Sequence, residues 1–253
     1  MTRSLRAVVF TIGALGVGGL LAWGFWGTPA FGHYRGPYGD ILQKRAVPER
    51  HATNVVNSVV FDYRGMDTIG EEFILFAAVM GVTLLLRRQR EEHELGPAQE
   101  RAEERSFLQT SDAVRVGSLV LIAPTEALGM YIVVHGHLTP GGGFQGGLVL
   151  AAAPLLIYLA GRYLVFRAVN PMRLLDFGEG LGAGGFVAIG LVGLVSATAF
   201  LQNVWPLGQV RSVFSGGFLP VINLAVGLEV AAGLVLVVYE FLEQTLVVRS
   251  GGR

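Results

Sequence analysis

The stretch HGHLTPGGGFQGG, residues 135–147, lies between two long apolar segments and decides how the second half of the chain folds. Thr139 followed by Pro140 predicts a helix start. A hydroxyl can cap the first amides of a helix, and proline needs no amide partner at the first helical position. The glycines 141–143 would then form the first turn, with amide groups that no side chain covers. Such a helix end attracts negative charge or a lone pair.

Two histidines, His135 and His137, precede these glycines, and an unperturbed imidazole titrates near neutral pH. The stretch predicts either a turn that handles protons or ions, or a turn that only lets two helices approach closely. Gly143, Gly147 and Ala151 recur every four residues and form a packing seam, which suits the second interpretation. A phosphate loop is not indicated, because no strand precedes the glycines and no Lys-Ser/Thr pair follows them. The residues to which we assign a structural role are Thr139, Pro140, Gly141, Gly142, Gly143, Gly146 and Gly147.

This stretch, followed by an apolar helix, closely resembles the signature of the MnhB/MrpB family. That family supplies the B-type component of Mrp-type sodium/proton antiporters and its relatives in membrane-bound hydrogenase-type complexes. The resemblance implies a subunit that works inside a larger assembly. It also implies Na⁺ and H⁺ as transported ions, with no cofactor held by this chain.

The composition is that of a membrane protein: 52% of the 253 residues are hydrophobic and 15% are charged. The formal net charge is zero, so no nucleic-acid partner is implied. The chain has no cysteine, which excludes disulfides, thiolate metal sites and iron–sulfur ligation by this chain. No nucleotide loop or nucleophile–base set is visible. We therefore predict no catalytic residue, no metal site and no enzymatic activity for the chain by itself.

Hydropathy predicts an all-α, polytopic integral membrane protein with about six transmembrane helices. The predicted spans are residues 7–25, 69–86, about 116–134, the glycine turn to 158–165, 181–201 and 218–242. For the first span a cleaved signal peptide is the alternative, although the apolar run is long for one. A short amphipathic helix at the membrane surface is predicted near residues 55–60, with four valines on one face and Asn54, Asn57 and Ser58 on the other.

The stretch NVVNSVVFDYRGMDTIGEE, residues 54–72, carries a second resemblance. It is similar to the C-terminal part of the large A-type component of Mrp antiporters and to the small E-type component of membrane-bound hydrogenases. The matching positions are Asp62, Arg64, Gly65, Asp67, Thr68, Gly70 and Glu71. Asp67, Glu71 and Glu72 are candidates for an ion or proton pathway. The alternative is that they only cap the second span, since acids favour a helix N-terminus.

A densely charged stretch divides the two resemblances, so we interpret the chain as a natural fusion. The predicted parts are a two-helix membrane domain at residues 1–92, a charged cytoplasmic linker at 93–112 and a four-helix MnhB/MrpB-like domain at 113–253. The mixed charges of the linker suit a solvated segment.

Charge distribution predicts the orientation of the spans. With the N-terminus inside, thirteen of the 19 Lys and Arg residues lie in the inner segments and six in the outer ones, five of these in one long loop. This distribution obeys the positive-inside rule. We predict a multi-pass protein of a prokaryotic inner (cytoplasmic) membrane with both termini in the cytoplasm, which places the glycine turn on the outer side.

Two glutamates, Glu126 and Glu229, are predicted near the middle of their spans, where a charge costs several kcal/mol unless it is paired or hydrated. No Lys or Arg of the chain is predicted at that depth. Both are therefore pathway candidates, and His135 and His137 would serve as outer groups of a relay. The alternative is a neutral carboxyl that hydrogen-bonds between helices and contributes only to packing.

Asn223 is the last pathway candidate. It lies in PVINLAVGL, residues 220–228, which resembles the last helix of the MnhB/MrpB family, where Asn or Asp commonly holds this position. An amide does not titrate, so Asn223 cannot itself carry a proton in the way that an acid does.

These observations predict a membrane subunit of an Mrp-type monovalent cation (Na⁺)/proton antiporter module, which supplies an ion route or its scaffold. The resemblance implies the lipid bilayer and other Mrp-type subunits (A/D-, C-, E-, F- and G-like) as partners. One alternative is the same subunit in a hydrogenase-type or respiratory complex, beside redox subunits. A second alternative is a structural assembly subunit with no ion path.

Overall fold

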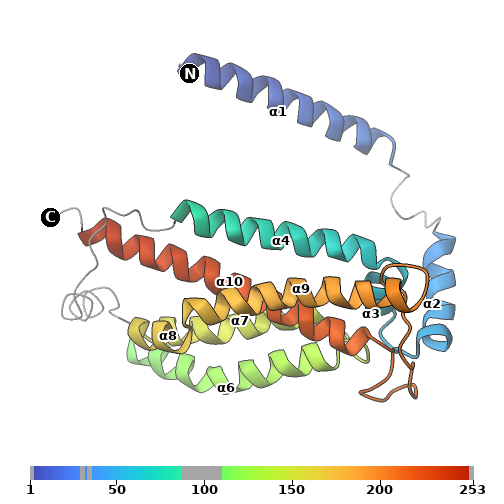
Figure 1. The fold of residues 1–253 in the computed structure, drawn as a ribbon. Coiled ribbons are helices and arrows are strands. Elements are labelled where there is room, and N and C mark those ends of the chain that lie inside the picture. Colours follow the sequence, from blue (N-terminus) through green and yellow to red (C-terminus); the bar gives the residue numbers. More distant parts are fainter. Residues whose placement is uncertain (1–2, 29–31, 33–35, 87–109, 251–253) are drawn as a thin grey trace. The chain divides into compact units, whose positions relative to one another are not determined.

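The computed structural model describes residues 3–28, 32, 36–86 and 110–250, and within them every regular element is a helix (Figure 1). The all-α prediction is therefore confirmed. The elements are α1 (Arg3–Trp26), α2 (Pro37–Arg50), α3 (Val55–Ser58), the π-helical turn η1 (Val59–Tyr63), α4 (Gly65–Leu86), α6 (Asp112–Val134), α7 (Gly143–Leu159), α8 (Tyr163–Val169), α9 (Met172–Ser196) and α10 (Leu219–Ser250).

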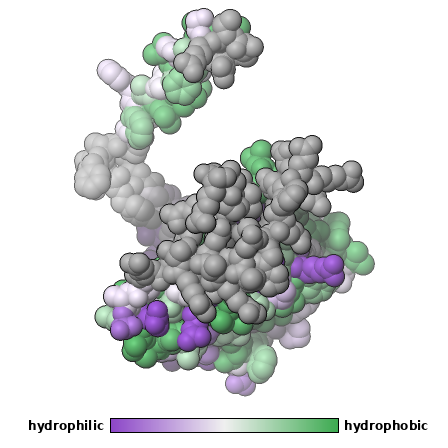
Figure 2. Space-filling view, turned by 90° about the vertical axis from the view of Figure 1, so that its left-hand side faces the viewer, coloured by the Kyte–Doolittle hydropathy of each residue, from purple (hydrophilic) through white to green (hydrophobic). Residues whose placement is uncertain are grey.

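Five of the described helices are long and apolar enough to cross a membrane, namely α1, α4, α6, α9 and α10. A sixth apolar helix, α7, has 17 residues and is about 25 Å long, slightly less than the hydrocarbon thickness of a bilayer. The chain breaks after it at Gly161, which has φ +77°, and then forms α8. The predicted fourth span is thus two helices. Figure 2 views the α8 end of the helical body, where the coloured residues include hydrophilic side chains among hydrophobic ones.

The chain divides into two compact units, residues 1–40 and 41–253. The first contains α1, whose apolar span buries no side chain within the chain. In the second, α10 packs against α4, α6, α7 and α9. Because α4 packs on both α9 and α10, this helix of the first predicted membrane domain shares a core with the helices of the second. Residues 93–109 of the predicted linker lie outside the described residues.

Small residues let α10 approach its neighbours closely. A Cβ atom at Gly143 would lie 2.6 Å from a valine side chain of α10, and one at Gly147 would lie 2.8 Å from an α10 carbonyl oxygen. On α9, a Cβ at Gly182 would lie 2.6 Å from the backbone nitrogen of Glu229. The predicted seam of Gly143, Gly147 and buried Ala151 is therefore a packing surface, as expected.

The glycine turn does not start a helix at Thr139. Instead α7 begins at Gly143, and the glycines 141–142 adopt φ values of +147° and +149°, which favour glycine. The Thr139 hydroxyl donates to the His135 carbonyl oxygen at 3.3 Å and caps nothing in α7. The prediction of a Thr139 cap with Pro140 as first helical residue is wrong, because another helix supplies the cap.

Asn223 of α10 supplies that cap. Its Oδ1 atom accepts hydrogen bonds from the backbone nitrogen of Gly143 and from Nδ2 of Asn57, both at 2.9 Å. Its own Nδ2 donates to Asn57 Oδ1 at 3.0 Å and to the Leu219 carbonyl oxygen at 2.7 Å. Both asparagines are buried. One amide pair therefore ties α3, the start of α7 and α10 together.

Residues just before α3 hold the rest of the turn. The Thr53 hydroxyl donates to the Leu138 carbonyl oxygen at 2.5 Å, and Asn54 Nδ2 donates to the carbonyl oxygens of Gly136 and Thr139 at 2.7 and 2.9 Å. The first amide of α7 and the carbonyl groups of the turn thus have partners inside the protein.

The predicted short helix near residues 55–60 is present as α3 and η1, and its polar side faces inward. Asn57 and Ser58 are buried, whereas Val56 is exposed. The polar side is buried because its amides bond to the glycine turn and to α10 instead of to water.

Replacing Asn223 with alanine leaves the Gly143 amide and the Asn57 side chain without their buried partner. We expect a loss of about 2–4 kcal/mol in unfolding free energy, since each unsatisfied buried group costs about 1–3 kcal/mol. Thermal unfolding of the purified protein in detergent measures this. Asn223→Asp keeps the acceptor for Gly143 and should lose less. Equal stability of Asn223→Ala and wild type would contradict the assigned role.

Candidate functional site

Three glutamates from three helices are buried in the interior of the second unit. Glu72 lies on α4, Glu179 on α9 and Glu229 on α10, and their exposed fractions are 2%, 2% and 0%. Glu72 and Glu229 lie close enough to interact electrostatically, and so do Glu179 and Glu229. We call Glu72, Glu229 and Glu179 the carboxylate row.

Glycines bring the three helices together around the row. Gly182 of α9 packs on the backbone of Glu229. A Cβ at Gly233, one turn after Glu229, would lie 3.5 Å from Oε1 of Glu179 and 3.0 Å from the Val79 side chain of α4. No bulky side chain therefore separates α4, α9 and α10 at this level.

The row extends along the helix axes. Helices α4 and α10 begin at the end of the second unit that carries the glycine turn, and α9 begins at the opposite end, next to α8 (Figure 1). At 1.5 Å per residue, Glu72 lies about 10 Å and Glu229 about 15 Å from the glycine-turn ends of their helices. Glu179 lies about 10 Å from the α8 end of its helix. The carboxylates are thus staggered between the two ends.

No cationic side chain in the described part of the chain forms an ion pair with the row. The carboxylate oxygens of Glu72 and Glu229, and Oε1 of Glu179, have no hydrogen-bond partner among the described residues. A buried, unpaired carboxylate is costly, so adjacent ones are tolerated when they hold protons or bind a cation. The arrangement suits uptake and release of H⁺ or a monovalent cation.

A small cavity lies beside the glycine-turn end of the row. Its volume is about 120 Å³, room for a few water molecules. Its polar lining comes from Asn57, Thr68, Glu71, Gln145 and the glycines 141–143. Thr68 precedes Glu72 by one helical turn, and Glu71 is exposed. Water can therefore approach the row to within about one turn of α4.

Further acidic and aromatic groups lie toward the α8 end. Glu240 is buried and follows Glu229 by eleven residues, or about three turns, on the same face of α10. Beyond it, the Tyr163 hydroxyl donates to Oε1 of Glu243 at 3.3 Å, and Arg167 lies 3.8 Å from the same oxygen. Polar groups thus continue from the row toward this end.

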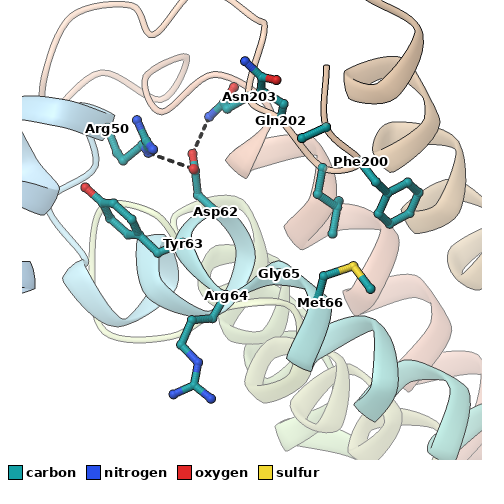
Figure 3. Close-up of a pocket in the computed structure, with 11 residues that line it drawn as sticks. Arg50, Asp62, Tyr63, Arg64, Gly65, Met66, Phe200, Gln202 and Asn203 are labelled. Carbon is teal, nitrogen blue, oxygen red and sulfur yellow. Dashed lines mark hydrogen bonds and ion pairs between the residues drawn. The ribbon is translucent and has the colours of Figure 1, made fainter. Parts of the chain in front are cut away.

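A larger pocket of about 390 Å³ lies between η1 and the loop after α9 (Figure 3). Arg50 and Asn203 both point toward Asp62, whereas Arg64 points away. Arg50 Nε lies 2.7 Å from Asp62 Oδ1, and Asn203 Nδ2 donates to Asp62 Oδ2 at 2.8 Å. Burial raises the pKa of Asp62, although the hydrogen bond from Asn203 and the charge of Arg50 oppose this shift. These bonds join η1 to α2 and to the loop, which is a structural role.

Known proteins resemble the two halves of this chain separately. The family model of a domain related to the MnhB subunit of Na⁺/H⁺ antiporters matches residues 113–236, and the model of MbhE, the E-type component of MBH, matches residues 6–102. An uncharacterized protein of Methanocaldococcus jannaschii is 31% identical over 198 residues, which are 72% of this chain and 74% of that protein. The chain belongs to the MnhB family. It carries an MbhE segment before its MnhB domain.

Two solved structures resemble the whole MnhB-family chain. A chain of the membrane-bound sulfane sulfur reductase, an archaeal respiratory membrane complex, is 34% identical with a TM-score of 0.69, and the match covers 94% of this chain and 98% of that one. A chain of the Mrp complex from Dietzia sp. is 25% identical with a TM-score of 0.65. That match covers 95% of this chain and 26% of the longer Mrp chain.

The structure separates the acids that the sequence grouped in the MbhE segment. Glu72 is buried in the carboxylate row, Glu71 is exposed beside the small cavity, and Asp67 forms an exposed ion pair with Arg64. Asn223 caps the MnhB glycine turn. Thus only Glu72 among the three acids of this segment lies beside Glu229.

The two histidines of the MnhB turn are not brought to the glutamates. His135 stacks on Tyr131 with ring centroids 4.4 Å apart, and His137 is fully buried with Nε2 3.4 Å from the Ser212 carbonyl oxygen. Neither forms a hydrogen bond with Glu126 or Glu229 in the described structure. Glu126 itself is exposed on α6, away from the row. The predicted relay through these four residues is therefore not assembled.

Sequence reasoning missed Glu179. The predicted fifth span began at residue 181, so the acid in FGEGLGAGG was placed outside the membrane. In the structure α9 begins at Met172 and carries Glu179 seven residues into the helix. The small residues around it were the available signal, because they mark a face on which another helix packs closely.

Burial lowers the pKa of His137 below its usual value of 6.5, so the folded protein holds this imidazole neutral. The unfolded chain binds a proton near pH 6.5 and the folded one only at lower pH, so stability falls as pH drops below about 6.5. The slope should approach about 1.4 kcal/mol per pH unit. Thermal unfolding between pH 8 and 5 measures it, and His137→Gln should reduce the slope. His135→Gln, at the half-buried neighbour, should retain it.

Proposed function

We propose that this chain is a non-catalytic membrane subunit of a multi-subunit monovalent cation/proton antiporter module, and that its carboxylate row exchanges H⁺ and Na⁺. The observation that carries the proposal is the burial of Glu72, Glu179 and Glu229 without a cationic partner in the described structure. The match to a domain related to the MnhB subunit of Na⁺/H⁺ antiporters supports it.

The elementary step is a competition for one negative charge. A protonated glutamate in the row is neutral and tolerates burial. When it releases its proton, the carboxylate must be compensated, and Na⁺ is a suitable hard cation for carboxylate oxygens. Binding of Na⁺ therefore favours release of H⁺, and binding of H⁺ favours release of Na⁺. This competition couples the movement of the two ions in opposite directions.

Access to the row is proposed from both ends. The 120 Å³ cavity lies at the glycine-turn end, and Glu240 follows at the α8 end. The charge distribution along the sequence supports a cytoplasmic α8 end and cytoplasmic termini in a prokaryotic inner membrane. The partners we propose are the other Mrp-type subunits.

A second candidate function is favoured by the archaeal structure. Its chain is matched over almost its full length, at higher identity than the Mrp chain. The same carboxylate row would then serve a respiratory-type complex, in which redox subunits drive ion movement. Iron and nickel analysis of the complex purified with this chain separates the two functions. Iron in amounts that match iron–sulfur clusters in each complex favours the respiratory function. A complex without such iron favours the antiporter function.

The test of the proposed site is Na⁺-dependent proton flux in vesicles that contain the assembled complex. Glu229→Gln, Glu72→Gln and Glu179→Gln each remove one titratable group without a large change in volume. We expect each to lower flux at least about tenfold, because positioned proton transfer contributes a factor of about 10² or more. Native gels check that the complexes remain assembled.

Asp112→Asn is the matched control. Asp112 is the exposed first residue of α6, a helix that contributes no residue to the row. We expect wild-type flux from this variant. Wild-type flux from all three row variants in assembled complexes would refute the exchange site and leave the chain a structural assembly subunit.

A further inference from the structure

Glu126 lies beside an apolar groove on the surface of the second unit. The groove has a volume of about 500 Å³ and runs between α6, α7, α9 and α10. Residues that line it include Glu126, Met130, Pro154, Phe177, Gly178 and Ala231. Phe177 is 64% exposed and Met130 49%, so large apolar side chains at the groove have no cover from the described part of this chain.

Glu126 is the acidic residue of this groove and is deep within a spanning helix. It follows Asp112 by fourteen residues and precedes Val134 by eight, so it lies about 12 Å from the nearer end of α6. The carboxyl forms no ion pair or hydrogen bond with any described residue. The closest basic residue on its own helix is Arg115, eleven residues or about 16 Å away.

Lipid alone does not satisfy this position. Acyl chains offer no hydrogen-bond donor at that depth, and a polar group left bare in hydrocarbon costs several kcal/mol. A membrane-spanning helix can present a donor at any depth. The groove also offers small residues, Gly178 and Ala231, where a helix backbone can approach closely.

We propose that this groove receives a membrane-spanning helix of a partner subunit, and that a Lys, Arg or His side chain on that helix pairs with Glu126. A cationic side chain carries the charge that is complementary to the Glu126 carboxylate. Each of the two charges is costly alone within a membrane, and pairing lowers the cost of both. This interface is distinct from the carboxylate row, which is buried between α4, α9 and α10.

The first experiment places p-benzoylphenylalanine at Phe177 in the otherwise wild-type complex, purified through a tag on this chain. After irradiation, mass spectrometry maps the cross-linked peptide. We expect a membrane helix of another subunit with a basic residue within one turn of the mapped site. Cross-links to lipid alone, or to a helix without a basic residue there, overturn the proposal.

The second experiment tests the charge. Glu126→Lys places two cations together and should lower the amount of partner subunit that co-purifies about a hundredfold. Glu126→Asp keeps the charge and should retain more partner than the neutral Glu126→Gln. Replacing the mapped basic residue with Glu should restore assembly of Glu126→Lys. Full assembly of Glu126→Lys, or failure of this exchange to restore it, contradicts the pairing.

Discussion

The reciprocal amide pair of Asn57 and Asn223 is the contact on which the arrangement of this chain depends. Each asparagine lies in a different sequence family's segment, and each is buried. Together they bond to each other and, through Asn223 Oδ1, to the first amide of α7. An amide pair has fixed donor and acceptor geometry, so it sets the position of α3 relative to α10 more sharply than apolar packing does. Position 136 of the glycine turn then has room only for glycine, because a Cβ at Gly136 would lie 2.8 Å from Asn223 Oδ1.

The carboxylate row follows from that fixed position. Helix α4 starts directly after η1, and Glu72 lies seven residues into it. Because α3 and η1 are held against α10, Glu72 reaches Glu229, and Gly182 lets α9 bring Glu179 to the same region. Three acids that are far apart in sequence thus meet in an apolar interior. Their burial is tolerable in a membrane only with protons or cations present, which links the packing of the helices to the chemistry proposed for them.

The helices and the position of Glu229 inside the last of them follow from the sequence, because long apolar runs and an acid in the middle of one of them are local features. The glycine turn shows the limit of that reasoning. Thr139-Pro140 has the local pattern of a helix start, but the cap that decides the start of α7 comes from Asn223, 80 residues away. The hydropathy of the sequence also predicted too late a start for α9, because acids and glycines lower the average hydropathy there. Glu179 lies in the first two turns of the helix, which the predicted span omitted. The inward face of α3 was likewise set by partners that no local pattern reveals.

The joining of an MbhE segment and an MnhB domain in one polypeptide has a consequence for how strong their interface must be. Two separate proteins that dock lose translational and rotational freedom, and their contact must overcome that loss at cellular concentration. A covalent link makes the same docking intramolecular, which raises the effective concentration of each part for the other. The Asn57–Asn223 contact therefore needs to be specific but not strong. The link also fixes a one-to-one ratio of the two parts, so every copy of the chain that is made carries Glu72 together with Glu179 and Glu229.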